Sequence, residues 1–374
     1  MTKKIKLRDI CRLINGRAYK QDELLDEGKY PVLRVGNLFS DKDFYYSDLE
    51  LEEDKYCDNG DLLFAWSASF GPKVWDGGKV IYHYHIWKME LSDKVDRDYL
   101  YFYLYYLSER IKSEGHGGIM LHTTKAEMEE REFVLPELAE QKRIVEQLAK
   151  ISAVINTRKQ QLDQLDELVK ARFVELFGDT VLNPFGWEKE LLGRICDVRD
   201  GTHDSPQYFD IGFPLVTSKN VTGGIIDLTD CSLICEKDYN KINERSKVDM
   251  GDIIMPMIGT VGKPVIVDIE PNFAIKNVSL IKFKSDSRVL NIYIRALLQS
   301  DYFDDAVLSK VRGGTQKFIS LGDIRKLEIL VPPLELQEQF AAFVKQADKS
   351  KTVVQKALDE AQTLFDSLMQ QYFG

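Results

Sequence analysis

The feature that most constrains the fold is a long stretch in the middle of the chain that recurs in altered form at its end. The first copy spans residues 134–178 and the second spans residues 331–374. Pro136 and Gly178 of the first copy match Pro332 and Gly374 of the second, with no insertion between the matched positions. Such a repeat indicates that the chain consists of two related halves.

Apolar side chains recur in each copy with heptad spacing, and no Gly or Pro interrupts the pattern. This spacing predicts two long helices that pair with each other as an antiparallel coiled coil. At 1.5 Å per residue, roughly forty residues make a rod of about 60 Å, which suits a spacer. The predicted seam consists of Ile144, Leu148, Ile151, Ile155, Leu162 and Leu165 in the first copy and Phe340, Val344, Val354, Leu358, Phe365 and Leu368 in the second.

Two basic residues, Arg158 and Lys351, interrupt the apolar seam near the middle of each predicted helix. A polar group at a seam position commonly fixes the register and orientation of a coiled coil at some cost in stability. Alternatively, the apolar stems lie flat on the helix surface and the charges reach solvent. The sequence does not decide between these two interpretations.

The composition is that of a globular protein of two or three domains, with 374 residues of which 44% are hydrophobic. The formal net charge of −10 suggests weak DNA binding by the chain alone, although phosphate binding depends on a local basic face rather than on the total. Five scattered cysteines without a CxxC pair predict neither a disulfide framework nor a zinc site. With no membrane-spanning run and no signal-type core, we expect a cytoplasmic protein without a membrane partner.

The repeat extends beyond the helices, because residues 7–16, 31–37 and 60–64 match residues 192–201, 214–220 and 251–255. The expected fold class is α+β, with two mixed α/β domains separated by two long helices that form an antiparallel coiled coil with pseudo-twofold symmetry. The expected segments are a first domain at residues 1–135, a central helix at 136–178, a linker at 179–190, a second domain at 191–331 and a C-terminal helix at 332–374.

The aromatic run at residues 99–107 fits either an alternating strand or a helix. Its counterpart at residues 293–298 has a more helical pattern, so we expect a helix in both places. The tyrosines of this run are a candidate platform for base stacking, but packing in the core is the favoured interpretation.

No catalytic site is predicted. Residues 259–263 resemble a fragment of a phosphate-binding loop, but the full spacing is missing and Pro264 removes a backbone donor. The sequence at residues 183–185 resembles part of an amino-methyltransferase motif, yet its second proline is absent. His83 and His85 suit a metal site only with a third ligand, and none is identifiable by spacing, so contact with DNA or burial is favoured for both.

Polar, basic and aromatic residues gather around glycines in loops of both halves, which is the pattern of a DNA-contacting surface. For any one of these residues a solvated loop is the alternative. The candidates are Arg34, Asn37, Trp66, Ser67, Ser69, Lys73, His83, His85, Gly117, Gly118, His122, Thr123 and Lys125 in the first half and Thr202, His203, Thr217, Lys219, Asn220, Lys263, Arg312, Gly314, Thr315, Gln316 and Lys317 in the second.

Taken together, the chain resembles the specificity (S) subunit of type I restriction-modification systems. The resemblance rests on the PELAEQKRI sequence at residues 136–144, on Leu-Phe-Gly at residues 176–178, on the GDLLF and GDIIM segments and on LGRICDVRDGTH at residues 192–203. It implies that residues 1–135 and 191–331 are target-recognition domains, each reading one half of a split sequence in double-stranded DNA. The loops of the two halves differ, which predicts two different half-sites.

The resemblance also implies partners and a division of labour. The helices would set the gap between the half-sites and dock two modification (M) subunits, and a restriction (R) subunit can then join. No cofactor is expected in this chain, while S-adenosylmethionine, ATP and Mg are expected on the partner subunits. A coiled-coil scaffold or regulator that binds proteins through its end domains is the alternative, and an autonomous methyltransferase or nuclease is disfavoured by the missing motifs.

Overall fold

The structure is a computed structural model of the chain, and it describes residues 3–40, 42–67, 69–114, 123–257, 263–306 and 318–374. The chain forms two compact units. Unit 1 consists of Met1–Lys159 with Lys356–Gly374, and unit 2 consists of Gln160–Gln355. Each unit therefore contains one mixed domain together with a part of each long helix.

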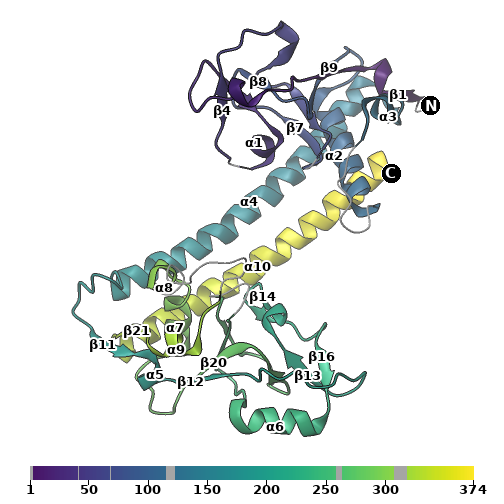
Figure 1. Cartoon of the computed structure of the whole chain (residues 1–374). Helices are drawn as coiled ribbons and strands as arrows, with labels where there is room; N and C mark the ends of the chain where they lie inside the picture. Colours follow the sequence, from purple (N-terminus) through teal and green to yellow (C-terminus); the bar gives the residue numbers. More distant parts are fainter. Residues whose placement is uncertain (1–2, 41, 68, 115–122, 258–262, 307–317) are drawn as a thin grey trace. The chain divides into compact units, whose positions relative to one another are not determined.

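Two long helices, α4 (Leu138–Phe177) and α10 (Leu334–Phe373), lie side by side in opposite directions within each unit (Figure 1). In unit 1 the start of α4 meets the end of α10, where Tyr372 donates a hydrogen bond to Gln147. In unit 2 the end of α4 meets the start of α10, where the rings of Phe173 and Phe340 are 5.5 Å apart. The predicted antiparallel pair is therefore confirmed.

The predicted seam residues are shielded from solvent to different degrees. Ile144, Leu148, Ile155, Phe340, Val344, Leu358 and Phe365 are buried, whereas Ile151, Leu162, Leu165, Val354 and Leu368 are half-buried. The basic Lys351 pairs with Asp166 of the other helix. Because this pairing forms only when the two residues lie side by side, it supports the interpretation that Lys351 fixes the register.

Unit 1 contains two four-stranded sheets. One sheet has the order β2-β9-β6-β7 and is antiparallel, and the other has the order β4-β3-β8-β5 with β3 and β8 parallel. The elements of its domain are β1 (Lys3–Lys6), β2 (Cys11–Asn15), β3 (Tyr30–Leu33), α1 (Val35–Phe39), β4 (Tyr45–Ser47), β5 (Tyr56–Cys57), β6 (Leu62–Ala65), β7 (Gly71–Val74), β8 (Val80–Tyr82), β9 (Ile86–Leu91), α2 (Arg97–Glu114), α3 (Lys125–Glu129) and β10 (Glu132–Leu135).

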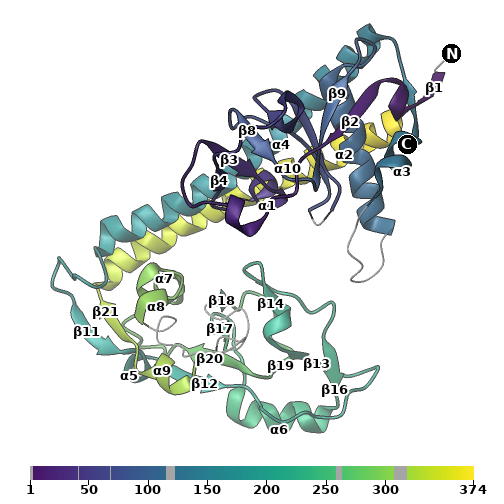
Figure 2. The same ribbon diagram turned by 45° about the horizontal axis from the view of Figure 1, so that its top comes forward.

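Unit 2 repeats this plan with the sheets β12-β20-β17-β18 and β16-β13-β19, in which β13 and β19 are parallel. The helix α6 lies next to the second sheet (Figure 2). The elements of its domain are β11 (Glu188–Leu191), α5 (Leu192–Ile195), β12 (Asp197–Asp200), β13 (Phe213–Val216), β14 (Val221–Thr222), β15 (Ile225–Ile226), β16 (Ser232–Ile234), α6 (Glu236–Ser246), β17 (Ile253–Pro256), β18 (Val265–Ile266), β19 (Ala274–Ile275), β20 (Val278–Lys282), α7 (Asn291–Leu297), α8 (Asp301–Ala306), α9 (Leu321–Arg325) and β21 (Glu328–Val331).

The predicted α+β class is confirmed, and the aromatic run and its counterpart both form helices, α2 and α7. Tyr99 of α2 is fully buried and its ring lies 5.4 Å from that of Phe373, so this part of the run packs in the core of unit 1. The last residues of the predicted linker, 179–190, lie in β11, which pairs with β21. The five predicted segment boundaries and the pseudo-twofold symmetry stay predictions. No helix in the described ranges is both long and apolar enough to cross a membrane.

Each long helix is fastened to its domain by one buried glutamine. The Oε1 atom of Gln141 accepts a hydrogen bond from the backbone N–H of Asp96 at 2.7 Å, and its Nε2 donates to the carbonyl groups of Lys94 and Pro136. Gln337 repeats all three bonds in unit 2 with Leu290, Arg288 and Pro332. The heptad pattern places both glutamines at seam positions, but they bind their own domains instead.

Two matched glycines let the chain approach the parallel strand pair closely. A Cβ atom at Gly16 would lie 2.3 Å from the carbonyl oxygen of Tyr82, and one at Gly201 would lie 2.3 Å from that of Ile275. Both distances are shorter than any non-bonded contact allows. Only glycine therefore permits the bridges that follow, between Arg17 and His83 in unit 1 and between Thr202 and Lys276 in unit 2.

Replacing Gly201 by Ala should lower the free energy of unfolding by at least about 2 kcal/mol, because the new methyl group collides with backbone rather than with a flexible side chain. The change in the midpoint of thermal unfolding of the full chain measures this effect. Gly322→Ala is the matched control, since a Cβ at that helical position would lie 3.5 Å from the Ser320 hydroxyl, an ordinary van der Waals distance. Equal midpoints for the two variants would contradict the close approach.

Replacing Gln141 by Ala should lower the free energy of unfolding by about 3 kcal/mol, because three backbone groups lose their partner and buried polar groups are costly when unpaired. Urea-induced unfolding of the full chain, followed by circular dichroism, measures the loss. Gln164→Ala, at an exposed position of α4, serves as the control and should change little. If both variants unfold at the same urea concentration, Gln141 does not anchor the helix.

Candidate nucleic-acid interface

Loops that follow three strands of unit 1 meet at one edge of its sheets. β3 and β8 are parallel, so Arg34 and His83, which follow them, leave the sheet on the same side. β6 and β9 are antiparallel and pair at the end of β6, which places Trp66 beside His85. The backbone N–H of Trp66 donates to the carbonyl of His85 at 3.1 Å. We call residues 34, 66 and 83–85 edge 1.

Aromatic rings dominate edge 1. The ring of Trp66 lies 4.9 Å from that of His85, and the ring of Tyr84 lies 4.0 Å from that of His85. The indole N–H of Trp66 donates to the carbonyl of Tyr84 at 2.8 Å and so ties two loops together. Tyr84 keeps 38% of its surface exposed. Flat rings held in this way offer stacking surfaces and polar ring edges to a nucleic acid.

The two histidines of edge 1 are biased toward the neutral form. Burial lowers the pKa of His83 to about 4, and the nearby His85 and Arg34 add to the effect. Burial also lowers the pKa of His85. Neutral imidazoles carry one donor and one acceptor each, so they suit base edges better than phosphates, and the positive charge of this edge comes from the exposed Arg34.

Unit 2 builds the equivalent edge from different side chains. The backbone N–H of Lys276 donates to the carbonyl of Val216, and that of Thr202 donates to the carbonyl of Ile275, at 2.9 and 3.0 Å. These bonds bring together the ends of β12, β13 and β19. We call residues 202–203, 217 and 276–277 edge 2.

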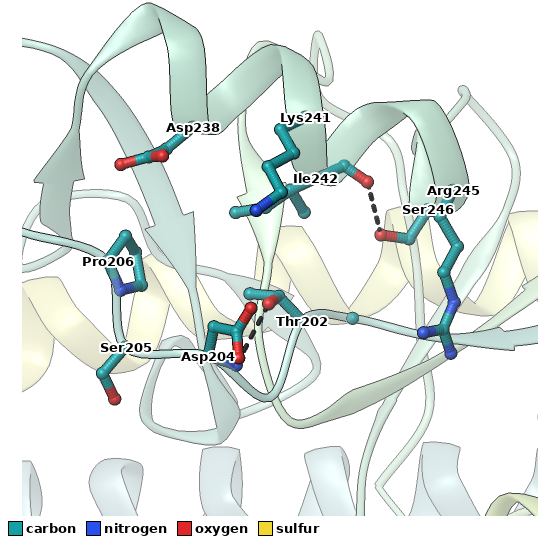
Figure 3. A pocket seen from close by; sticks show the side chains of 10 residues that line it. Thr202, Asp204, Ser205, Pro206, Asp238, Lys241, Ile242, Arg245 and Ser246 are labelled. Atoms are coloured by element: carbon teal, nitrogen blue, oxygen red, sulfur yellow. Dashed lines mark hydrogen bonds between the residues drawn. The ribbon is translucent and has the colours of Figure 1, made fainter.

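A pocket of about 230 Å³ lies beside edge 2 (Figure 3). Side chains of α6, including Lys241 and Arg245, face the loop that carries Thr202 and Asp204 across it. Arg245 pairs with the nearly buried Asp200, whose carboxylate also accepts a bond from His203 at 2.9 Å. The wall of the pocket carries both signs of charge, from Asp204, Asp238, Lys241 and Arg245, and of these Arg245 is paired with Asp200 behind the wall.

Several predicted contact residues use their polar groups for hydrogen bonds within the chain. The amide of Asn37 binds Arg34, Lys42 and Asp43, and that of the buried Asn220 binds Thr217 and Asp230. These two matched asparagines cap the turns after β3 and β13. With their amides occupied, they shape the edges rather than extend from them.

The other predicted residues are distributed as follows. Thr123 and Ser67 are buried, Lys125 donates to the carbonyl of Leu13, and Lys73 lies on strand β7 rather than in a loop. Ser69, Lys219 and Lys263 are exposed. Gly117, Gly118, His122, Arg312, Gly314, Thr315, Gln316 and Lys317 lie outside the described residues. The part of the chain that is described contains no cluster of three or more His, Cys, Asp or Glu side chains that suits a metal ion. Every contact with DNA stays a prediction.

Sequence reasoning missed Lys276 and Asn277, which occupy in edge 2 the place of His83 and Tyr84 in edge 1. β19 has only two residues and no turn signal follows it, so the local pattern is weak. The equivalence comes from the parallel strand pairs, because Tyr82 pairs with Leu33 and Ile275 pairs with Val216. The repeat alone points only near this place, since the offset of the GDLLF and GDIIM segments puts Tyr82 over Phe273.

Comparison with known proteins gives consistent relatives for the whole chain. The type I restriction enzyme EcoBI specificity subunit of Escherichia coli is 21% identical over 404 residues, covering 99% of this chain and 85% of that protein. The MjaVIII specificity subunit of Methanocaldococcus jannaschii is 27% identical over 382 residues, covering 94% and 89%. The crystal structure of an S subunit from M. genitalium has a TM-score of 0.58 at 17% identity, covering 100% and 96%, which is a likeness of fold.

A family model also matches most of the chain. The model described as the type I restriction modification DNA specificity domain matches residues 2–167 and 184–362, and so includes both sheets of each unit and both edges. Because these matches cover most of both halves, the chain belongs to the family of type I restriction modification DNA specificity domains.

Proposed function

We propose that the chain is the DNA sequence-specificity subunit of a type I restriction-modification complex, in which edge 1 reads one half of a bipartite site and edge 2 reads the other. The observation that carries this proposal is that one scaffold occurs twice with different side chains at the equivalent edge. A shared scaffold positions both edges alike on DNA, while sequence is read by the groups that differ.

The two edges differ in chemistry, which supports two unlike half-sites. Edge 1 offers aromatic rings in edge-to-face contact, two imidazoles and Arg34. Edge 2 offers the ammonium group of Lys276, the amide of Asn277 and an exposed histidine, His203. Arginine and lysine suit guanine, whereas amides suit adenine or single acceptors, so the two edges favour different base pairs.

The remaining parts of the proposal concern the helices and the partners. The paired helices set the gap between the two half-sites and offer docking surfaces to two modification subunits. Methyl transfer with S-adenosylmethionine, and translocation and cleavage with ATP and Mg, then take place on modification and restriction subunits, and this chain performs no chemistry of its own. The acidic net charge of −10 agrees with partners that supply much of the phosphate contact.

Lengthening both helices should change the gap and leave the half-sites alone. Seven added residues that continue the heptad pattern lengthen a helix by about 10 Å, which corresponds to up to about three base pairs of DNA. Methylation mapping of cells that express this chain with its modification subunits should first give a bipartite motif, and the variant should give the same halves with a longer gap. A single continuous motif for the unaltered complex would contradict the proposed function.

The same seven residues inserted at the Gly223–Gly224 turn between β14 and β15 form the control, because that insertion leaves both helices unchanged. This control should retain the original gap. An unchanged gap in the helix variant would exclude the helices as the element that sets the spacing.

Replacing Arg34 by Ala should weaken recognition of one half-site only. Loss of an arginine contact to a base or phosphate typically costs 1–3 kcal/mol, so we expect binding of the cognate DNA to fall roughly tenfold. Competition binding with DNA altered in either half-site measures the effect for the complete complex. Arg12→Ala is the control, since Arg12 pairs with Glu90 on β9 away from edge 1. Equal losses for both variants would remove Arg34 from the interface.

A further inference from the structure

Four hydrogen-bonded side chains form a network that begins beside edge 2, at Arg245 and Asp200, and ends on edge 2, at His203 and Asn277. Arg245 of α6 pairs with Asp200 at the end of β12. The Oδ2 atom of Asp200 lies 2.9 Å from Nε2 of His203, and Nδ1 of His203 lies 2.8 Å from Oδ1 of Asn277. The side chain of Asp200 is 10% exposed and that of His203 is 63% exposed, so the network leads from the interior outward.

The donors and acceptors of this network fix the state of His203. A carboxylate only accepts, so Nε2 of His203 must carry a proton toward Asp200. The Oδ1 atom of Asn277 is also an acceptor, so Nδ1 must carry a second proton. With both acceptors in place, the protonated imidazolium is favoured over the neutral ring. The bonds to Asn277 and Asp200 accordingly raise the pKa of His203, while burial and the charge of Arg245 oppose them.

The backbone of Asn277 is fixed as well. Its φ angle is +55°, a left-handed conformation that asparagine tolerates better than most residues do, and its N–H donates to the carbonyl of Thr202 at 3.1 Å. With Oδ1 held by His203, the Nδ2 group has no partner within the part of the chain that the structure describes, and the residue is partly exposed. Asn277 thus presents two N–H donors at edge 2.

We propose that Asn277 is a specificity-determining residue of unit 2 that donates to an acceptor atom on a base edge, and that His203 is the positioning residue that holds its amide in this orientation. This inference rests on the proposed function. In the major groove the acceptors are N7 of a purine, O6 of guanine and O4 of thymine. The two-bond contact that asparagine commonly makes with adenine needs Oδ1, which His203 occupies.

Loss of a proton from His203 reverses what Asn277 offers. The neutral imidazole keeps the proton on Nε2 toward Asp200, so Nδ1 becomes an acceptor. The amide then turns about its terminal bond to donate from Nδ2 to Nδ1, and Oδ1 faces outward to accept from N6 of adenine or N4 of cytosine. The charged groups around His203 are Asp200 on β12, Arg245 on α6, the adjacent Asp204, and Lys276, whose Nζ donates to Ser205.

Two substitutions at Asn277 test the reading role in the complete complex with its modification subunits. Asn277→Gly keeps the left-handed backbone and removes the amide, so preference at one base position of one half-site should relax roughly fivefold, the value of one hydrogen bond. Asn277→Asp presents only acceptors, so the preferred base at that position should change to one with a donor. Methylation rates on DNA randomised at each position of both half-sites measure these effects.

Asn272→Ala is the control, because Asn272 is exposed on the segment that leads into β19 and lies outside edge 2. It should retain every base preference. If Asn277→Gly also methylates with unchanged preference at all positions, the inference is overturned while the proposed function stands. If the unaltered complex shows no sequence preference at all, the proposed function fails as well.

A second measurement examines the role of His203 without DNA. The chain has five histidines, so the imidazole signals of labelled protein are assignable with a His203→Gln variant. The pKa of His203 should fall in Asn277→Gly and rise in Asn277→Asp, since the first loses an acceptor and the second adds a negative charge. Base preference at the affected position should change with pH around the measured pKa in the unaltered complex and not in His203→Gln. An unshifted pKa in both Asn277 variants would overturn the positioning role.

Discussion

The buried amides of Gln141 and Gln337 hold each long helix to the domain from which it starts. Each amide bonds through its oxygen and both N–H groups to two backbone segments of its own unit. One segment lies just before the long helix, and the other lies just before α2 in unit 1 or α7 in unit 2. A buried amide that makes three hydrogen bonds to backbone groups has no second position of comparable energy. Within a unit, the first turn of the long helix is therefore fixed relative to the sheets, and so also relative to the edge of that unit.

The two units place the edges by the same means. In each, a parallel strand pair ends beside the first strand of the antiparallel sheet, and a glycine allows the backbones to touch. The bonds that hold the edges in place are largely main-chain bonds, such as those of Arg17 to Tyr82 and Thr202 to Ile275. Side-chain bonds such as that of the Trp66 indole to the carbonyl of Tyr84 add to them.

Much of the architecture could be predicted from the sequence, because the two halves of the repeat give two sequence patterns for the same set of elements. A heptad pattern that continues for about forty residues leaves no alternative to a helix. The ambiguous residues 99–107 are identified as helical through the pattern of their counterpart in the second half. Gln141 and Gln337 could not be interpreted correctly, because a heptad position says which face a residue occupies but not which element covers it. Their partners lie more than forty residues away for the bonds to Lys94 and Arg288.

The edges were only partly predictable for a related reason. Loop composition identified Trp66, His83, His85 and His203, all of which lie at an edge. It equally suggested Asn37 and Asn220, because an asparagine that caps a turn and one that faces a ligand look alike in sequence. Asn277 was missed because its exposure depends on a two-residue strand and on a left-handed backbone, and no sequence motif predicts either of them.

The glycine contacts at positions 16 and 201 have a consequence for how such proteins diversify. Since main-chain bonds hold the strand ends together, a change of an outward side chain that makes no bond within its domain leaves the folding energy of the scaffold nearly intact. New recognition can therefore arise through a few substitutions at the rim of a domain, and natural selection can explore target sequences without first having to repair the protein.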